Sequence, residues 1–321
     1  MARRELGPAA LQVTRAVRAA MPDPGTPVVL GVSGGADSMA LAAGAAWVRR
    51  AAQRAGQPVP QVGAVVVEHG LQAGSAEVAA QVADRVRALG LDVEVVRVDV
   101  GEAGEGPEAA ARRARFEALR ARAGDGVVML GHTLDDQAET VLLGLARGSG
   151  PRSLAGMRGW GWGLARPLLG LRREVTRQAC AEWGIEVWQD PHNEEERFAR
   201  VRVRRTVLPM LEAQLGPGIT EALARTADLA RADADALDAL ADQERARWDE
   251  EPDCSVLFRL PEAISSRAVR GWLVQRGAIQ PSAAHVAAVM ALVHDWHGQG
   301  PVDLPGLRVQ RRVGRLVAVR D

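Results

Sequence analysis

The chain has 321 residues, of which 47% are hydrophobic and 25% charged, a balance that is typical of a folded protein with more than one domain and excludes a disordered chain. Its 40 basic residues are all arginines and are matched by 40 acidic residues, so the zero net charge excludes nucleic-acid binding driven by overall charge. The apolar runs are shorter than the roughly 20 residues of a membrane span, and the two distant cysteines, Cys180 and Cys254, exclude a disulfide framework.

The first two-thirds of the chain alternates β-branched runs with alanine-rich helical stretches, which is typical of a parallel sheet covered on both faces. After an N-terminal amphipathic helix, we expect strands at residues 28–32, 62–67, 93–98, 127–131 and 185–188. The helices are expected at residues 38–55, 75–89, 108–123, 135–147 and 172–183. The predicted fold class is therefore α/β with a doubly wound parallel sheet, in which ligands bind at the carboxyl ends of the strands.

The remaining segments suggest a second, smaller domain. A tryptophan- and glycine-rich stretch at residues 156–163 is expected to form a loop over the sheet edge. Gly216-Pro217-Gly218 predicts a boundary between a domain of residues 1–216 and one of residues 217–321. The second domain is expected to be mainly helical, ending in a β-hairpin, with helices at 219–247, 261–276 and 282–294 and strands at 307–312 and 316–320.

Residues 33–38, Ser-Gly-Gly-Ala-Asp-Ser, lie between the first expected strand and its helix. Adjacent glycines can turn backbone N–H groups toward an anion, and the helix N-terminus attracts negative charge to the same place. Ser33 and Ser38 add hydroxyl donors, whereas the Asp37 carboxylate would repel a phosphate unless a cation such as Mg²⁺ lies between them. The lack of lysine excludes a Walker-type P-loop, and an ordinary turn with Asp37 near the N-cap is the simpler alternative.

An acidic segment opens the helix after the fourth expected strand. Asp135, Asp136 and Glu139 share roughly one helix face because they are spaced three and four residues apart. Acids in a first turn are ordinarily explained by the helix dipole. Here, however, three acids repel one another and no basic residue stands four positions on. The pattern therefore predicts a missing cation, either magnesium or the ammonium group of a substrate.

Weaker signals come from arginines and one histidine. Arg112 and Arg115 are three residues apart on a helix and suit a triphosphate or an RNA backbone, although an exposed helix face is the commoner explanation. His69 follows a strand and could contact a nucleotide or only bond within its turn. Residues 197–205 carry five arginines and no acid, which indicates a local basic face for RNA, with solvated surface arginines as the alternative.

Taken together, these motifs resemble a known family. Residues 33–38 are similar to the PP-loop of the N-type ATP pyrophosphatases, and residues 130–140, followed by 145–150, resemble the second signature of the tRNA(Ile)-lysidine synthetases. The motif order is kept over about residues 28–211, including 68–71, 111–116, 154–157, 166–169 and 190–200. The chain departs from the family pattern at four positions outside the phosphate loop and the acidic segment, namely Gln72, Phe116, His192 and Val201.

The resemblance implies ATP-dependent ligation of lysine to C2 of the wobble cytidine of a CAU-anticodon tRNA(Ile), through an adenylated tRNA, with release of pyrophosphate and AMP. The residues it implies for catalysis are Asp37, Arg112, Asp136 and Glu139. It implies that ATP is bound by Ser33, Gly34, Gly35, Ala36, Asp37, Ser38, His69 and His132. Mg²⁺ would be held by Asp37 and Asp136, and lysine by Asp136 and Glu139. The tRNA would contact Arg115, Arg200, Arg202, Arg204 and Arg205.

Two alternatives compete with this interpretation. A PP-loop tRNA thiolase would need reactive cysteines or an iron–sulfur cluster, which Cys180 and Cys254 do not supply near the loop. An RNA-binding protein with a degenerate nucleotide site would have no reason to keep crowded acids. The expected partners are therefore ATP, free L-lysine and tRNA, without a membrane and in a reducing cytoplasm. The oligomeric state is open between a monomer and a homodimer.

Overall fold

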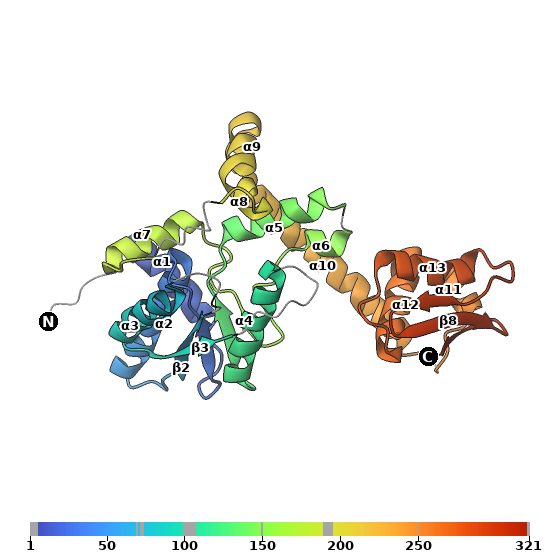
Figure 1. The fold of residues 1–321 in the computed structure, drawn as a ribbon, viewed down its shortest axis with the longest axis horizontal. Coiled ribbons are helices and arrows are strands. Elements are labelled where there is room, and N and C mark those ends of the chain that lie inside the picture. Colours follow the sequence, from blue (N-terminus) through green and yellow to red (C-terminus); the bar gives the residue numbers. More distant parts are fainter. Residues whose placement is uncertain are drawn as a thin grey trace. The chain divides into compact units, whose positions relative to one another are not determined.

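The computed structural model describes residues 6–68, 70, 74–98, 107–148, 150–188, 195–248 and 250–319. The chain divides into two compact units, Met1–Ala227 and Asp228–Asp321, and the division falls within helix α10 (Ile219–Arg245) (Figure 1). The boundary expected from the sequence lies earlier, after residue 216. Among the described residues, no helix combines the length and the hydropathy that crossing a bilayer would require.

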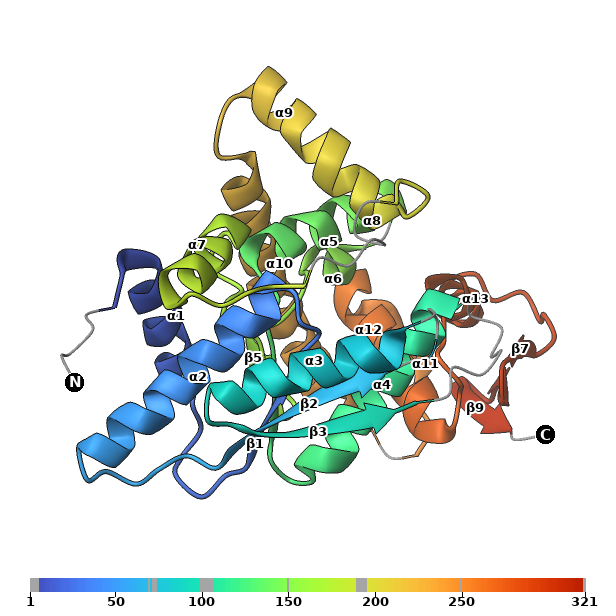
Figure 2. The ribbon, with the colours of Figure 1, turned by 60° about the vertical axis from the view of Figure 1, so that its left-hand side comes forward.

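The first unit contains a six-stranded sheet with the order β3-β2-β1-β4-β6-β5. The strands are β1 (Val28–Gly31), β2 (Val62–Glu68), β3 (Asp92–Arg97), β4 (Val127–Leu130), β5 (Trp160–Gly161) and β6 (Leu164–Ala165). All neighbouring pairs are parallel except β5 with β6. Figure 2 shows β1, β2 and β3 side by side, with α2 and α3 over one face. The predicted doubly wound α/β fold is confirmed.

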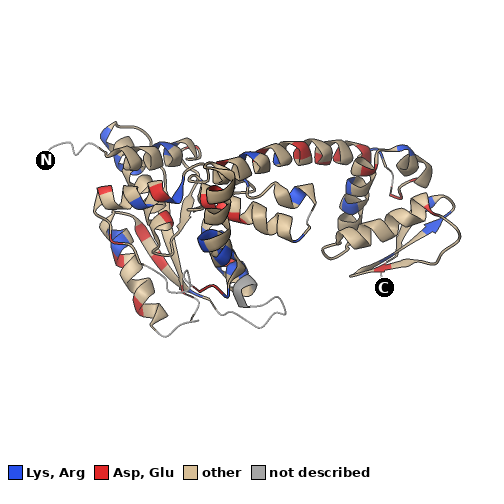
Figure 3. Cartoon of the chain, turned by 90° about the horizontal axis from the view of Figure 1, so that it is seen from above, with Lys and Arg blue, Asp and Glu red and all other residues tan. Residues whose placement is uncertain are grey.

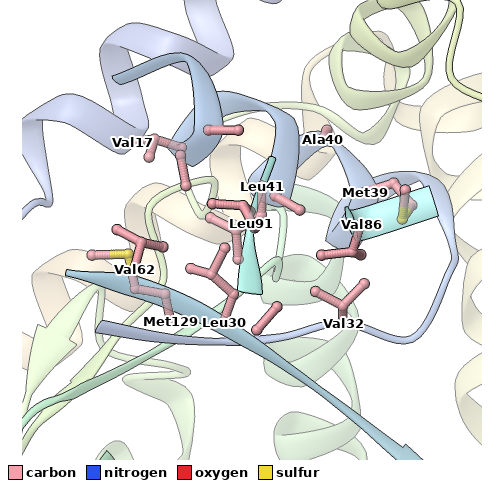
Figure 4. Packing of buried hydrophobic residues seen from close by; sticks show 14 of the residues in the cluster. Val17, Leu30, Val32, Met39, Ala40, Leu41, Val62, Val86, Leu91 and Met129 are labelled. Atoms are coloured by element: carbon pink, nitrogen blue, oxygen red, sulfur yellow. The ribbon is translucent and has the colours of Figure 1, made fainter. Parts of the chain in front are cut away.

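Both faces of the sheet are covered by helices. One face packs against α1 (Pro8–Ala19), α2 (Ala36–Arg54), α3 (Ser75–Ala88) and α7 (Arg173–Trp183). The other face packs against α4 (Pro107–Ala123). Val28 and Leu30 of β1 belong to the first core layer together with Met39 and Met129, whereas Val29 belongs to the second. Figure 4 shows Leu30, Met39 and Met129 within the first layer. Burial on both faces explains why these strands are continuous apolar runs.

The prediction of a strand at residues 185–188 is wrong. These residues form no strand; Ile185 and Val187 pack against the core, and the Trp188 N–H donates to the Gly34 carbonyl at 3.0 Å. Their β-branched content therefore reflects burial without strand pairing. The expected loop at 156–163 instead contributes β5 and leads into β6, whose Leu164 and Ala165 pair with the edge of β4. Two-residue strands are too short to produce a readable alternation.

The other helices of this unit lie at the carboxyl end of the sheet. They are α5 (Leu134–Ala146), α6 (Pro151–Leu154), α8 (Ala199–Arg202), the π-helical turn η2 (Val203–Val207) and α9 (Leu208–Leu215). Ala138 of α5, Val203 of η2 and Leu208 of α9 form a small buried cluster. This cluster fixes the arginine-bearing turn η2 against the acidic helix α5. Short π-helical stretches are frequently found at functional sites.

The second unit combines helices with an antiparallel sheet. Its helices after α10 are α11 (Cys254–Arg259), α12 (Glu262–Arg276) and α13 (Ala283–His294). Its strands β7 (Val302–Leu304), β8 (Leu307–Arg312) and β9 (Arg315–Val319) follow one another in the sheet. The core contains Leu257, Trp272, Val289 and Leu316. The predicted hairpin is confirmed as β8 and β9, whereas β7 and α11 were not expected from the sequence.

Gly131 follows β4 and packs tightly against the first turn of α2. A Cβ atom added at Gly131 would lie 2.7 Å from the Asp37 carbonyl oxygen and 3.0 Å from the Ser38 nitrogen. We therefore expect Gly131→Ala to lower the free energy of unfolding by about 1–3 kcal/mol, measured by urea denaturation, because backbone atoms must move. Gly159→Ala is the matched control, since nothing lies within 4 Å of its added Cβ. Equal reductions in both variants would contradict the close-packing argument.

Candidate active site

The loop at residues 33–38, called the phosphate loop below, lies at the carboxyl end of β1. Hydrogen bonds of the Ser38 hydroxyl join its two ends. The Ser38 Oγ accepts from the Ser33 N–H at 3.2 Å and donates to the Gly35 carbonyl at 2.9 Å. Gly34 has φ +86°, and a Cβ there would lie 2.5 Å from Val82 Cγ2, so only glycine fits. Gly35 is extended and caps α2, so one of the two glycines, not both, adopts a positive φ. The predicted strand–turn–helix arrangement is present.

The acidic segment begins α5 directly after β4. Asp136 Oδ2 accepts from both the backbone N–H and the hydroxyl of Thr133, each at 2.8 Å, and so caps the helix. Its other oxygen, Oδ1, is left for a cation. Glu139, one turn further along, is completely buried. Because β1 and β4 are neighbours, the Asp37 turn and the start of α5 meet at one edge of the sheet.

The cation beside these carboxylates is Arg173, at the first position of α7. Its Nε donates to Asp37 Oδ2 at 3.1 Å, its Nη2 to Asp136 Oδ1 at 2.6 Å and its Nη1 to Glu139 Oε1 at 3.3 Å. The Thr176 hydroxyl, one turn later, also donates to Asp37. Sequence reasoning expected magnesium or a substrate amine here and missed Arg173. The available signal was two adjacent arginines at a helix N-terminus, where the dipole disfavours positive charge.

The basic segment at 197–205 divides into two faces. The Arg204 Nε donates to Glu139 Oε1 at 2.7 Å, and its Nη2 donates to Oε2 at 3.1 Å. The Arg200 Nη2 donates to the Thr140 hydroxyl at 3.0 Å. In contrast, Arg202 and Arg205 are exposed, and the Arg202 Nη1 donates to the carbonyls of Glu196 and Arg197, at 2.6 and 2.8 Å. The expected tRNA-contacting arginines therefore do not share one environment.

Apart from His132, the remaining predicted site residues lie on α4 or outside the described residues. Arg112 and Arg115 are exposed on α4. In Figure 3 the basic residues are blue and the acidic residues red; the charged residues of α10 are mostly acidic. His69, His192 and the signature residues at 190–194 lie outside the described residues. Glu68, before His69, is buried and accepts from the Gly70 N–H at 2.7 Å and the Ser75 hydroxyl at 2.6 Å.

Burial is the largest influence on the pKa of both Asp37 and Asp136, with opposite outcomes. It raises the pKa of Asp37, against the lowering effects of Arg173 and Thr176. For Asp136 burial also acts to raise the pKa, but Arg173 and the Thr133 N–H outweigh it and the pKa is lowered. Burial acts to lower the pKa of Arg173, yet the three carboxylates more than compensate and the pKa is raised. Arg173 is therefore a permanent cation.

These contacts do not fit a metal ion resident between Asp37 and Asp136. The oxygens that would face such an ion both accept hydrogen bonds from Arg173. Nor do the described residues contain any group of three or more His, Cys, Asp or Glu side chains arranged to hold a metal. The crowding that suggested a missing cation has a protein cation as its counter-charge.

His132, two residues after β4, is half-buried beside this cluster. The Arg166 Nε donates to His132 Nδ1 at 3.1 Å, which leaves the proton of the neutral ring on Nε2. Burial lowers the pKa of His132 to about 4; Asp136 opposes this shift, and Arg166, Arg112 and Arg200 add to it. His132 is thus an uncharged hydrogen-bond donor at neutral pH.

We expect nitrogen-15 NMR of the imidazole to show His132 protonated on Nε2 and unprotonated on Nδ1 throughout pH 5.5–8. A neutral ring is retained because its pKa of about 4 lies below this range. The variant Arg166→Met removes the donor to Nδ1 and should allow both tautomers. A proton on Nδ1 in the unsubstituted protein, or a charged ring at pH 6, would contradict the assignment.

Comparison with known proteins agrees with this geometry. The PP-loop domain matches residues 9–211, and the TilS substrate binding domain matches residues 253–317. The tRNA(Ile)-lysidine synthase of Leifsonia xyli subsp. xyli is 51% identical over 306 residues, covering 91% of this chain and 90% of that protein. The tRNA(Ile)-lysidine synthase of Thermobifida fusca is 51% identical over 321 residues, covering 96% and 97%.

A solved structure supports the fold. The U34-tRNA thiolase NcsA of Methanococcus maripaludis, with its 4Fe-4S cluster, aligns with a TM-score of 0.52 and 16% identity, covering 68% of this chain and 78% of that chain. At this identity the likeness concerns the fold alone. The two domain matches and the relatives near 50% identity, which extend over nearly the whole chain, carry the assignment. The chain belongs to the tRNA(Ile)-lysidine synthase family.

Proposed function

We propose that this protein ligates lysine to C2 of the wobble cytidine in a CAU-anticodon tRNA(Ile), at the expense of ATP. The observation that carries the proposal is the meeting of the phosphate loop with the acidic start of α5. One guanidinium, that of Arg173, reaches both Asp37 of the loop and Glu139 of α5. A phosphate group and an amine bound by these two segments would therefore be neighbours. The names of the relatives support the same reaction.

The reaction has two steps in this proposal. The O2 atom of the cytidine attacks the α-phosphorus of ATP, a P–O bond forms, and pyrophosphate leaves. An amine of lysine then attacks C2, the C2–O bond breaks, and AMP leaves with that oxygen. Each step needs negative charge to be stabilised on phosphate oxygens.

The residues of this chain match those needs. Backbone N–H groups of the phosphate loop, the Ser33 and Ser38 hydroxyls and the N-terminus of α2 would bind phosphate oxygens. His132 would add a neutral donor from Nε2, and Arg112 would contribute positive charge near the α-phosphate. Asp136 and Glu139 would bind the ammonium group of lysine in place of Arg204, which pairs with both carboxylates here. Magnesium, in this proposal, enters with ATP, and no step depends on a resident metal site.

The tRNA would be contacted by the outward arginines. Arg202 and Arg205, both exposed, and Arg115 on α4 would meet phosphate groups of the backbone. Arg200 and Arg204 contact Thr140 and Glu139, so we assign them to the site itself. The proposal places the enzyme in the cytoplasm, where tRNA, ATP and free lysine occur together.

The direct test uses purified protein with ATP, magnesium, labelled lysine and a CAU-anticodon tRNA(Ile). We expect label to become attached to the tRNA while AMP and pyrophosphate are released in equal amounts. Asp37→Asn is expected to abolish turnover, because it removes the charge that joins the phosphate loop to Arg173. The methionine tRNA with the same anticodon is the control substrate. ATP cleavage without lysine transfer would sink the proposal and favour a different tRNA modification.

The outward arginines are tested by charge reversal. We expect the double variant Arg202→Glu, Arg205→Glu to bind tRNA more weakly. The slope of log affinity against log salt concentration should decrease in magnitude by about 0.7–0.9 for each phosphate group that the variant no longer neutralises. Arg54→Glu, exposed at the last position of α2, is the matched control and should leave the slope unchanged. A double variant with the original slope would return Arg202 and Arg205 to the class of solvated surface arginines.

A further inference from the structure

The acidic cluster is neutralised by the protein's own arginines. Four carboxylates gather at the sheet edge, those of Asp37, Asp135, Asp136 and Glu139. Four arginines pair with them, namely Arg172, Arg173, Arg200 and Arg204, at nitrogen–oxygen distances from 2.6 to 3.5 Å. Formal charges therefore balance among these eight residues, which leaves the cluster with little attraction for a further cation.

Arg173 is the member that joins the separate parts. Its three side-chain nitrogens reach three carboxylates that come from α2 and α5, and its backbone N–H donates to Asp135 Oδ2 at 2.7 Å. Only 13% of its side chain is exposed, against 29% for Arg204 and 40% for Arg172. A planar guanidinium can span three acceptors in this way, whereas a lysine ammonium is a point charge with a different geometry.

We propose that Arg173 is a positioning residue that takes the place of a divalent cation in this cluster. It holds the carboxylates of Asp37, Asp136 and Glu139 in one array and keeps the array closed to free Mg²⁺ before ATP binds. The part of this proposal that concerns lysine transfer rests on the proposed function; the part that concerns metal exclusion does not. Without Arg173 the three carboxylates would lack a shared counter-ion. We expect them then to close around a divalent metal, which hard oxygen ligands favour, an arrangement that they do not have while Arg173 lies between them.

The first experiment measures Mn²⁺ binding, as a spectroscopic substitute for Mg²⁺, by electron paramagnetic resonance on the full chain without nucleotide. We expect Arg173→Gln to bind Mn²⁺ at least about tenfold more tightly than the unsubstituted protein, equivalent to about 1.4 kcal/mol. Adding Asp136→Asn to that variant should abolish the gain. Arg177→Gln, on an exposed position of the same helix, is the matched control and should gain nothing.

Two outcomes would overturn metal exclusion. One is a folded Arg173→Gln variant that gains no Mn²⁺ affinity. The other requires no variant of Arg173. In this outcome the unsubstituted protein, without nucleotide, binds Mn²⁺ as tightly as a typical enzyme site, and Asp136→Asn abolishes this binding. The second outcome decides the question even if Arg173→Gln fails to fold.

The second experiment measures lysine transfer. Arg173→Lys keeps the positive charge but loses the planar guanidinium that spans three carboxylates. We therefore expect kcat to fall at least about tenfold, which is about 1.4 kcal/mol of transition-state stabilisation. For Arg173→Ala we expect partial rescue by guanidinium ions at concentrations well below denaturing ones, an effect that a purely structural defect would not show. Full activity of Arg173→Lys, or no rescue of a folded Arg173→Ala, would refute positioning. Inactive unsubstituted protein would instead refute the proposed function and leave the Mn²⁺ result standing.

Discussion

The ion-paired array around Arg173 is the constraint on which the first unit's functional edge depends. Three segments that are distant in the chain meet there, the phosphate loop, the start of α5 and the start of α7, and each brings charge that would be costly to bury alone. Glu139 is completely buried and is tolerable only because Arg173 and Arg204 both donate to it. Removing one cation would leave a buried charge under-compensated. The array therefore links the stability of this edge to its chemistry.

The sheet makes this meeting possible. β1 and β4 are adjacent and parallel, so the turns that follow them emerge at the same edge. Gly131 allows a close approach that a side chain would prevent, because its added Cβ would strike the Asp37 backbone. Packing of α7 against α1 and α2 then brings Arg173 and Thr176 to the same point. Apolar packing positions the helices, and the polar array forms where their ends converge.

Local patterns were predictable from the sequence, and contacts between distant segments were not. The phosphate turn and the acidic helix start are each continuous segments, and their strand–turn–helix setting could be read directly. No basic residue follows Asp135, Asp136 or Glu139 at four positions along the helix. The conclusion that the cation must come from outside the protein was nevertheless wrong, because Arg173 reaches Asp136 and Glu139 from another helix. Arg173 lies 136 residues from Asp37 and 34 from Glu139, so no helical or strand period connects them. Only the strand order and the path of α7 bring them together.

The division of the basic segment follows from the same distinction between sequence and space. Arginine content alone indicated a uniform RNA-binding face at residues 197–205. On the helical backbone, Arg200 and Arg204 are separated by one turn and face α5, while Arg202 and Arg205 face outward. Val203 is buried against α5, so η2 cannot shift without disturbing the Arg204–Glu139 pair. The short turn η2 thus carries one outward charge, Arg205, beside a counter-ion of the buried carboxylate, Arg204. A ligand bound at Arg205 would therefore act on the same turn that holds Arg204 in the site.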